Sequence, residues 1–325
     1  VYKYHMKILA VQNRMGIGDT VIFLPFIKAV SEKFNSPVSI LVKENSKADQ
    51  FLYQTRYIDK ILFLERDKKK NNRHGGFLGS LNLIREIKKH DFDMIIIFNS
   101  SLRFNLIAKL SGIREVYQYP LFKKTHQHIT NTPKKFLKEK LDIDVNKDPE
   151  VQIDNKLIYD SIEKFHINKN RKNILLGIGG SGPTKRIPAE IFLNVIEKLS
   201  KINKYNFFLA TGKDIEEQKI LNKILESKFR DLCQPLDDLS IKDTLPIIKN
   251  CDLSVCNDSS FSHLSAALGI KTITLMADTP LIYGNYSSKM FPIIPDGEET
   301  VNHNTLGKEK INPQKIFDKI IEILN

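Results

Sequence analysis

The chain of 325 residues has few cysteines, and their spacing suggests no bonded role. Cys233, Cys251 and Cys256 are odd in number and form no CxxC motif, so neither a disulfide framework nor a zinc site is indicated. No run approaches the roughly 18 consecutive apolar residues of a membrane span. The opening VYKYHMKILAVQ lacks the apolar segment and cleavage site of a secretory signal. We expect buried, reduced thiols, no membrane span and a cytoplasmic protein.

The familiar nucleotide-binding motifs are also missing. A dinucleotide fingerprint needs GxGxxG and an acidic residue about 20 positions later, whereas GIG at 16–18 runs directly into Asp19. The P-loop GxxxxGK[ST] is absent, because Lys185 follows Thr184 rather than a glycine. No group of carboxylates or histidines has the spacing of metal ligands. We therefore expect neither a metal nor another cofactor.

Positive charge is concentrated in the first half of the chain. The net charge is +12, and residues 1–150 contain 27 Lys and Arg against 16 Asp and Glu, whereas residues 151–325 contain 23 against 22. This asymmetry suggests that the first half meets something anionic, such as a nucleic acid, a phospholipid surface or a phosphorylated or carboxylated substrate. A lysine-rich composition without a specific partner is the alternative.

Short apolar runs alternate with longer amphipathic runs along the whole chain. This alternation is typical of parallel sheets with crossover helices, and the length favours two α/β domains of Rossmann type. We predict an N-terminal domain over residues 1–160 and a C-terminal domain over 161–325. Between residues 120 and 150 the pattern breaks into a lysine-rich stretch with Pro120, Pro133 and Pro149.

The segment NRMGIGDTVIFLP, residues 13–25, follows the first predicted strand. Gly16 and Gly18 would let the backbone approach a ligand at the carboxyl end of that strand, where open α/β sheets bind ligands. We predict that a helix begins at Asp19. Its carboxylate could take a proton from a substrate hydroxyl as general base, or it could simply cap the helix.

A second loop, GIGGSGPTKRIPAEIF at residues 177–192, follows the first strand of the second domain. The backbone N–H groups of residues 179–182, Ser181 among them, could bind phosphate oxygens. Lys185 could neutralise a diphosphate. The alternative is a solvated loop whose lysine and arginine have no ligand.

The third segment is CNDSSFSHLSAALGIKTITL, residues 256–275. Asp258, Ser259 and Ser260 could cap the helix that follows, and the free N–H groups at its start would form an anion site. His263 lies in the first turn and could face the same ligand or be a structural group. All three segments follow strand ends, so together they predict a cleft between the two domains.

These three segments resemble the motif regions of the ADP-heptose:lipopolysaccharide heptosyltransferase family, glycosyltransferase family 9. The resemblance runs from about residue 6 to 325 and includes IDKILFLERDKKK and DFDMIIIFNSSLRFNLIAKLSGI. It implies the GT-B fold, with two facing Rossmann-like domains and an interdomain cleft. The implied reaction is an inverting, metal-independent transfer of a sugar from a nucleotide donor, ADP-heptose in the family, to an anionic glycolipid of lipopolysaccharide type. It also suggests peripheral contact with the cytoplasmic face of the inner membrane.

The resemblance assigns roles residue by residue. Asp19 would be the general base, and Ser181 and Lys185 would bind the donor diphosphate. Glu216 or Glu217 would contact the ribose or base. The remaining donor-site residues would be Asp258, Ser259, Ser260 and His263. The basic cluster that would bind acceptor phosphates or carboxylates consists of Arg66, Lys68, Lys69, Lys70 and Arg73.

Two departures from the family pattern bear on the donor. The family has Asp-Thr-Gly where this chain has Asp258-Ser259-Ser260, and Phe-Gly-Pro-Thr where it has LMADTP. A side chain at Ser260 narrows the loop, so a sugar other than heptose is an alternative. A GT-B epimerase or hydrolase acting on a nucleotide sugar, and a nucleic-acid-binding module with salt-dependent affinity, are the competing functions.

Overall fold

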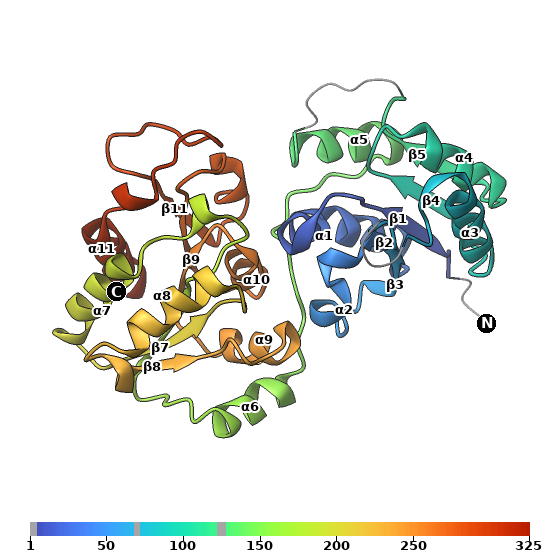
Figure 1. The fold of residues 1–325 in the computed structure, drawn as a ribbon. Helices are drawn as coiled ribbons and strands as arrows, with labels where there is room; N and C mark the ends of the chain where they lie inside the picture. Colours follow the sequence, from blue (N-terminus) through green and yellow to red (C-terminus); the bar gives the residue numbers. More distant parts are fainter. Residues whose placement is uncertain (1–4, 68–71, 122–127) are drawn as a thin grey trace. The chain divides into compact units, whose positions relative to one another are not determined.

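The structure, a computed structural model, describes residues 5–67, 72–121 and 128–325 (Figure 1). The chain divides into two compact units, Val1–Pro149 and Glu150–Asn325. Helix α6 (Asn155–Lys164) belongs to the second unit, and the boundary expected at residue 160 falls inside it. The amide of Asn250 fixes α6 to the unit by donating to the Ile158 carbonyl and the Ser161 hydroxyl, at 2.8 and 2.9 Å.

The first unit contains a parallel five-stranded sheet in the order β3-β2-β1-β4-β5. Its strands are β1 (Ile8–Val11), β2 (Val38–Lys43), β3 (Ile58–Leu64), β4 (Met94–Ile97) and β5 (Glu115–Gln118). Strands β1 and β4, ILAV and MIII, are buried at every position. Such continuous apolar runs are expected of central parallel strands, because helices cover both faces of the sheet.

Helices pack on both faces of this first sheet (Figure 1). They are α1 (Gly16–Phe34), the 3-10 turn η1 (Glu44–Ser46), α2 (Ala48–Phe51), α3 (Gly76–Lys88), α4 (Leu102–Leu110) and α5 (Asn131–Leu141). Helices α3 and α4 share a core with Leu9, Val11 and Ile95 of the sheet. Helices α1 and α5 contact each other.

Two expectations about helices in the first unit are wrong. The lysine-rich stretch that was expected to lack a pattern contains α5, whose third residue is Pro133. Proline fits the first turn of a helix, since its missing N–H would have no partner there. Helix α1 begins at Gly16 rather than at Asp19, so the predicted glycine loop forms the first turn of the helix.

The second unit contains a parallel six-stranded sheet in the order β11-β10-β9-β6-β7-β8. Its strands are β6 (Lys172–Gly177), β7 (Tyr205–Ala210), β8 (Cys233–Pro235), β9 (Leu253–Asn257), β10 (Thr272–Leu275) and β11 (Met290–Ile293). Strand β11 was not predicted from the sequence, because its MFPI contains Pro292. A proline is tolerated there because β11 is an edge strand.

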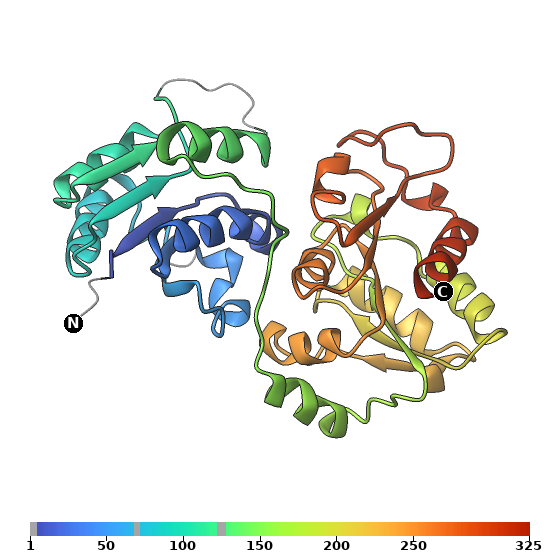
Figure 2. The ribbon, with the colours of Figure 1, turned by 180° about the vertical axis from the view of Figure 1, so that it is seen from behind.

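Helices also cover both faces of the second sheet (Figure 2). Besides α6, they are α7 (Ala189–Ser200), α8 (Ile215–Leu225), α9 (Ile241–Lys249), α10 (Ser260–Ala267) and α11 (Pro313–Leu324). Short 3-10 turns are η2 (Pro183–Lys185), η3 (Arg230–Leu232), η4 (Leu281–Tyr283) and η5 (Lys308–Lys310). Helix α7 contacts α8 and α11, whereas α9 contacts α6 and α10.

Both sheets reverse their strand order once, at a pair of neighbouring central strands. In the first sheet these are β1 and β4, and in the second they are β6 and β9. Ligands of open α/β sheets bind beyond the carboxyl ends of strands at such a switch point. Asp19 follows β1, Lys185 follows β6 and Asp258 follows β9, so each predicted segment lies at a switch point. The predicted pair of parallel α/β domains is confirmed.

Candidate active site

Glu217, in the first turn of α8, ties together the loops that follow β6 and β7. Its Oε1 accepts the Gly180 N–H at 2.6 Å, and its Oε2 accepts the Gly212 N–H at 3.0 Å. The side chain is buried, and a Cβ on Gly179 would lie 2.9 Å from Oε1, so any larger residue there would displace the Glu217 carboxylate. The expectation that Gly180 donates its N–H to a phosphate is therefore wrong, because Glu217 accepts it.

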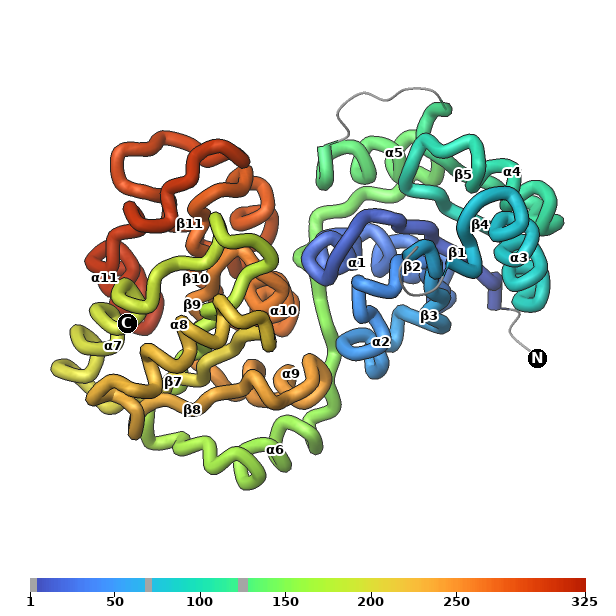
Figure 3. Tube along the Cα trace, in the orientation of Figure 1, coloured from blue at the N-terminus to red at the C-terminus, as the bar shows by residue number. Residues whose placement is uncertain are grey.

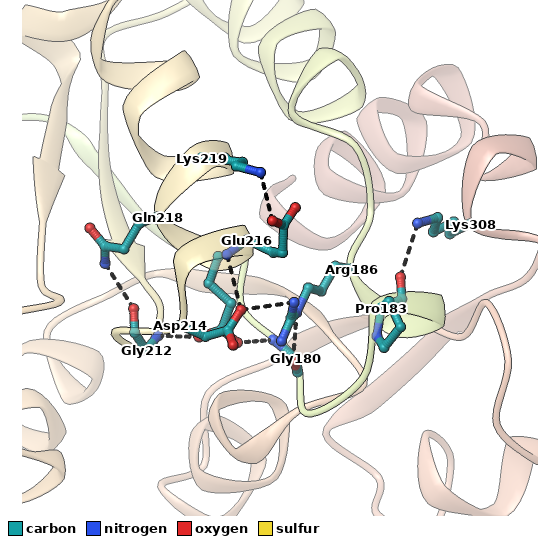
Figure 4. A network of polar contacts seen from close by, with 10 residues as sticks. Gly180, Pro183, Arg186, Gly212, Asp214, Glu216, Gln218, Lys219 and Lys308 are labelled. Carbon is teal, nitrogen blue, oxygen red and sulfur yellow. Dashed lines mark hydrogen bonds and ion pairs between the residues drawn. The ribbon is translucent and has the colours of Figure 1, made fainter.

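Arg186 braces the same two loops from a second direction (Figure 4). Its Nε donates to the Gly180 carbonyl at 2.9 Å, and its Nη1 lies 2.9 Å from Oδ1 of Asp214. Asp214 is the N-cap of α8 and accepts the Glu216 N–H at 3.0 Å. Arg186 thus acts within the loop framework, whereas its neighbour Lys185 points toward β9.

Glu216 lies on the open side of this framework. Its side chain is 59% exposed and pairs with Lys219 at 2.6 Å. It lines a pocket of about 280 Å³ with Pro183, Arg186, Lys308 and residues of α7 and α8. In Figure 4 the Lys308 ammonium points to the Pro183 carbonyl, 3.0 Å away. The cations of this pocket are held by protein groups.

Lys185 and Asp258 form a close ion pair where the loops after β6 and β9 meet. The Lys185 ammonium lies 2.6 Å from Oδ2 of Asp258, whose side chain is 6% exposed. Burial alone would raise the pKa of the Asp258 carboxyl. Interactions with His263 and with the charge of Lys185 outweigh burial and hold that pKa well below its ordinary value. Asp258 is therefore a fixed anion that orients Lys185.

His263 extends this pair into a chain of side chains. Its Nε2 lies 3.8 Å from Oδ1 of Asp258, and its Nδ1 is 2.8 Å from the Tyr286 hydroxyl. The His263 and Tyr286 rings stack with their centroids 5.6 Å apart. Sequence reasoning missed Tyr286, because the loop before β11 shows no motif and reaches His263 only in the folded unit.

The serines predicted at these loops differ in exposure. Ser181 is exposed, and Ser260 is the first residue of α10. Ser259 is the N-cap of α10, but its side chain makes no capping hydrogen bond, and its buried hydroxyl has no partner among the residues described. The predicted side-chain cap is therefore wrong for Ser259, and its hydroxyl is available to a ligand.

Further buried polar atoms lack a partner along the carboxyl edge of the second sheet. Within the described part of the chain they include the Thr211 hydroxyl after β7, Oδ1 of Asn257 at the end of β9 and the Thr279 hydroxyl after β10. Buried polar atoms nearly always have a hydrogen-bond partner, which can be a water, an ion or a ligand when it is not a protein group. Together with Ser259 they define one polar edge centred on the β6–β9 switch point.

Asp19 lies in the first turn of α1, after β1. Gly16 opens the helix with φ +91°, a conformation that favours glycine, and the N-cap is Met15. Asp19 is partly buried three residues further on. Asp19 is not the N-cap of α1, because the helix begins three residues before it. Gly18, predicted in a loop, is a helix residue.

Arg103 brings a cation to the same edge of the first sheet, at the start of α4 after β4. Its guanidinium donates from Nε to the Ser80 hydroxyl at 2.9 Å and from Nη2 to the His74 carbonyl. Its buried Nη1 has no partner among the described residues. Burial and the charge of Arg66 lower the pKa of Arg103, so an anion placed here would be stabilised.

Two more buried groups on this edge lack partners within residues 5–67, 72–121 and 128–325: Nε2 of Gln12, after β1, and the Tyr119 hydroxyl, after β5. Burial raises the pKa of Tyr119, so it remains a neutral donor. Sequence reasoning missed these groups and Arg103. The one available signal was a cation two residues after the small polar residues 99–101 that follow β4.

The predicted basic cluster is only partly described. Lys68, Lys69 and Lys70 lie outside the described residues. Arg66 is exposed, and Arg73 pairs with Glu86 at 3.2 Å. His74 is fully buried beside them: its Nδ1 accepts the Glu65 N–H at 3.1 Å, and its Nε2 lies 3.2 Å from Glu86. His74 fixes the end of the segment that carries the cluster.

The thiols and potential metal ligands offer no second site. Cys251 and Cys256 are buried as expected, but Cys233 is only half-buried. Burial raises the pKa of Cys233 and Cys256 to about 12, so neither is a thiolate at neutral pH. In the described ranges no three His, Cys, Asp or Glu side chains could together hold a metal ion. No helix there is both long and apolar enough to cross a membrane.

Comparisons with known proteins agree with this geometry. The model of glycosyltransferase family 9 (heptosyltransferase) matches residues 80–319. Lipopolysaccharide heptosyltransferase 1 of Campylobacter coli is 24% identical over 336 residues, covering 93% of each chain. A family 9 glycosyl transferase structure from Veillonella parvula superposes with a TM-score of 0.80 at 17% identity, covering 100% of this chain and 98% of the other.

The ADP-heptose lps heptosyltransferase II of E. coli superposes with a TM-score of 0.72 at 16% identity, covering 98% of each chain. At such identities the superpositions show the fold alone, which is the GT-B fold. The family match, which spans most of the chain, identifies the particular branch. The chain belongs to glycosyltransferase family 9, the heptosyltransferases.

Proposed function

We propose that this glycosyltransferase moves heptose from ADP-heptose to an anionic glycolipid of the lipopolysaccharide type, with inversion and without a required metal. The row of unpartnered buried polar atoms on the second sheet's carboxyl edge, beside the Lys185–Asp258 pair, carries the proposal. Its hydroxyls and amide oxygen suit a sugar nucleotide, and a cation lies beside them. The E. coli relative's name specifies ADP-heptose.

On the donor side, Lys185 faces the diphosphate, and Asp258 keeps its ammonium oriented. The first turn of α10 adds free backbone N–H groups and the Ser259 hydroxyl. Negative charge grows on the diphosphate as its bond to the anomeric carbon breaks. A preorganised ammonium therefore stabilises the transition state more than the ground state, which is how the enzyme can work without a metal.

On the acceptor side, Asp19 acts as general base. It takes the proton of the acceptor hydroxyl while that oxygen attacks the anomeric carbon from the side opposite the leaving group. One C–O bond forms, the C–O bond to the diphosphate breaks, and ADP leaves with the electron pair. A single displacement of this kind inverts the anomeric configuration.

Arg103 and Arg66 give the carboxyl edge of the first sheet, where the acceptor would bind, its preference for anions. Their mutual repulsion and the partial burial of Arg103 would both be relieved by a phosphate or carboxylate of the acceptor. Such an acceptor is an intermediate of lipopolysaccharide assembly, so we place the enzyme in the cytoplasm, at the inner face of the inner membrane.

The test is a transfer assay with ADP-heptose and heptose-deficient lipopolysaccharide. Mass spectrometry should show an acceptor heavier by one heptose, formed with ADP release. ADP-glucose and UDP-N-acetylglucosamine, run in parallel, test the alternative of a different donor. Release of nucleotide or epimerised sugar without acceptor would instead support the epimerase or hydrolase function.

Metal independence is tested in the same assay. Transfer should continue at an unchanged rate in EDTA, because Lys185 and the α10 N-terminus neutralise the leaving group. Loss of transfer in EDTA that Mg²⁺ or Mn²⁺ restores would overturn this part of the proposal.

A further inference from the structure

Helices α3 and α4 of the first unit expose large apolar side chains to solvent. Phe77 and Leu78 at the start of α3 are 79% and 74% exposed. On α4, Leu102, Leu106 and Leu110 are 44%, 49% and 59% exposed. We call these five residues the apolar face. Single exposed leucines need no explanation, but a contiguous apolar group usually marks an interaction site.

The five side chains lie on two helices that contact each other. Positions 102, 106 and 110 are four residues apart, so they form a stripe along one side of α4, about 12 Å long at 1.5 Å per residue. Helices α3 and α4 pack side by side (Figure 3). Arg103, next to Leu102, bonds Ser80, which is one turn beyond Phe77. The two parts of the apolar face are therefore fixed to each other.

The exposed charged residues of the two helices that carry the apolar face are basic. The exposed charged side chains of α3 and α4 are Arg85, Lys88 and Lys109. Glu86, the one acid in these two fully described helices, is partly buried and is held by Arg73 and His74. A second copy would bring like charges together, and a nucleic acid would leave the leucines unmatched. Apolar side chains that share their helices with exposed cations fit a lipid surface that carries anionic headgroups.

We propose that the apolar face of α3 and α4 inserts into the interfacial layer of a membrane that contains anionic lipid. Leucine and phenylalanine side chains enter the acyl boundary while Arg85, Lys88 and Lys109 meet headgroup phosphates. Both helices begin at the carboxyl edge where Asp19 and Arg103 lie. Docking here brings that edge to the membrane surface. The inference rests on the proposed function in one respect, since a lipid-borne acceptor gives the docking its purpose.

Co-sedimentation of the full chain with vesicles tests the proposal directly. One set of vesicles is pure phosphatidylcholine, and the other is phosphatidylcholine with one quarter phosphatidylglycerol. The test variant is Leu106→Ser/Leu110→Ser. The matched control is Tyr159→Ser/Ile202→Ser, which removes two side chains of the second unit that are 71% and 55% exposed. Circular dichroism melts confirm that both variants are folded.

We expect the wild-type chain to bind the anionic vesicles. The affinity of the test variant for them should be lower by at least about tenfold. The control should bind like wild type. Equal binding by wild type and test variant would overturn the proposal. So would a stable wild-type dimer, seen by analytical ultracentrifugation, that the test variant does not form.

A transfer assay separates failure of this inference from failure of the proposed function. The test variant should lose transfer to acceptor embedded in anionic vesicles but keep wild-type transfer to a delipidated, water-soluble acceptor. Equal loss on both acceptors would overturn membrane docking. Absence of transfer by the wild-type chain on either acceptor would count against the proposed function, while the vesicle binding would still be measured.

Discussion

The carboxyl edges of the two sheets share a topology but differ in their chemistry. On the second sheet the cation Lys185 is already paired with a buried carboxylate. Among the described residues, the unpartnered groups near that edge include those of the neutral Thr211, Asn257, Ser259 and Thr279. On the first sheet an unpartnered group belongs to a cation, Arg103, which a second arginine repels.

This difference indicates which ligand each edge can hold. A paired cation beside hydroxyls suits a sugar nucleotide, whose charge is confined to the diphosphate and whose remaining groups are neutral. An arginine that has no anionic partner among the described residues suits a ligand that carries negative charge. The comparison therefore predicts that substitutions at one edge act on the donor and substitutions at the other act on the acceptor or the proton transfer.

The largest effect is expected at the first edge, from Asp19→Asn. Turnover should fall roughly 10²- to 10⁴-fold, because the amide cannot take the proton of the acceptor hydroxyl. Donor affinity, measured by calorimetry with ADP, should stay within about twofold. Asp49→Asn is the control, since Asp49 also lies in the first turn of a helix after a strand of this sheet. Near-wild-type transfer by Asp19→Asn would mean that Asp19, at the carboxyl edge of the first sheet, is not the general base.

At the second edge, Lys185→Ala should lower kcat about 10²- to 10³-fold, since one preorganised contact to a developing charge is lost. Arg186→Ala is the neighbouring comparison. It should weaken ADP binding and lower the melting temperature while leaving kcat closer to wild type, because Arg186 braces the loops. A crippled kcat in Arg186→Ala with a normal Lys185→Ala would reverse these two assignments.

Glu217→Gln tests whether Glu217 holds the loops after β6 and β7 in place before any ligand binds. One of the two N–H acceptors becomes a donor, so the Gly180 or Gly212 N–H is left unpaired, at a cost of about 1–3 kcal/mol in the free energy of unfolding. Urea denaturation measures this loss. Glu216→Gln is the matched control, because Glu216 is exposed and should change stability by less than about 0.5 kcal/mol. Equal losses in the free energy of unfolding from the two changes would mean that Glu217 does not stabilise the two loops.

The smallest expected effect is a pH dependence at Asp258. Its pKa in the folded protein lies below the ordinary 3.8, so the unfolded chain binds the proton first as pH falls. The stability that Asp258 contributes is full above about pH 5 and begins to be lost below about pH 4. The gap in unfolding free energy between wild type and Asp258→Asn should narrow by under about 1 kcal/mol from pH 6 to 3.5. A gap that widens would contradict the lowered pKa.

The sequence predicts the two sheets because each central strand is a short apolar run that can be recognised without knowledge of distant residues. ILAV and MIII are unbroken apolar runs, and the residues after β1, β6 and β9 necessarily meet at carboxyl edges once the strands are parallel. Strand β11 and helix α5 are hard to predict because each contains a proline. Pro292 is tolerated because β11 is an edge strand, and Pro133 is tolerated because it lies in the first turn of α5.

The candidate site is less predictable, because its contacts join distant segments. The role of Glu217 depends on Gly180, 37 residues away, and that of Asp258 on Lys185, 73 residues away. Arg103 gained its significance from burial beside Arg66, which no spacing in the sequence reveals. Motifs locate the loops, but the partner of each side chain is decided by packing.

The start of α1 has a consequence for handedness. Gly16 has φ +91°, yet a Cβ built there would meet no atom within 4 Å. The position therefore excludes other residues by the chirality of the backbone rather than by lack of room. A D-alanine introduced at residue 16 by chemical ligation would adopt this conformation readily, whereas L-alanine would be strained. The first turn of α1, which contains Asp19, thus requires at residue 16 a backbone conformation that D-residues favour and L-residues do not.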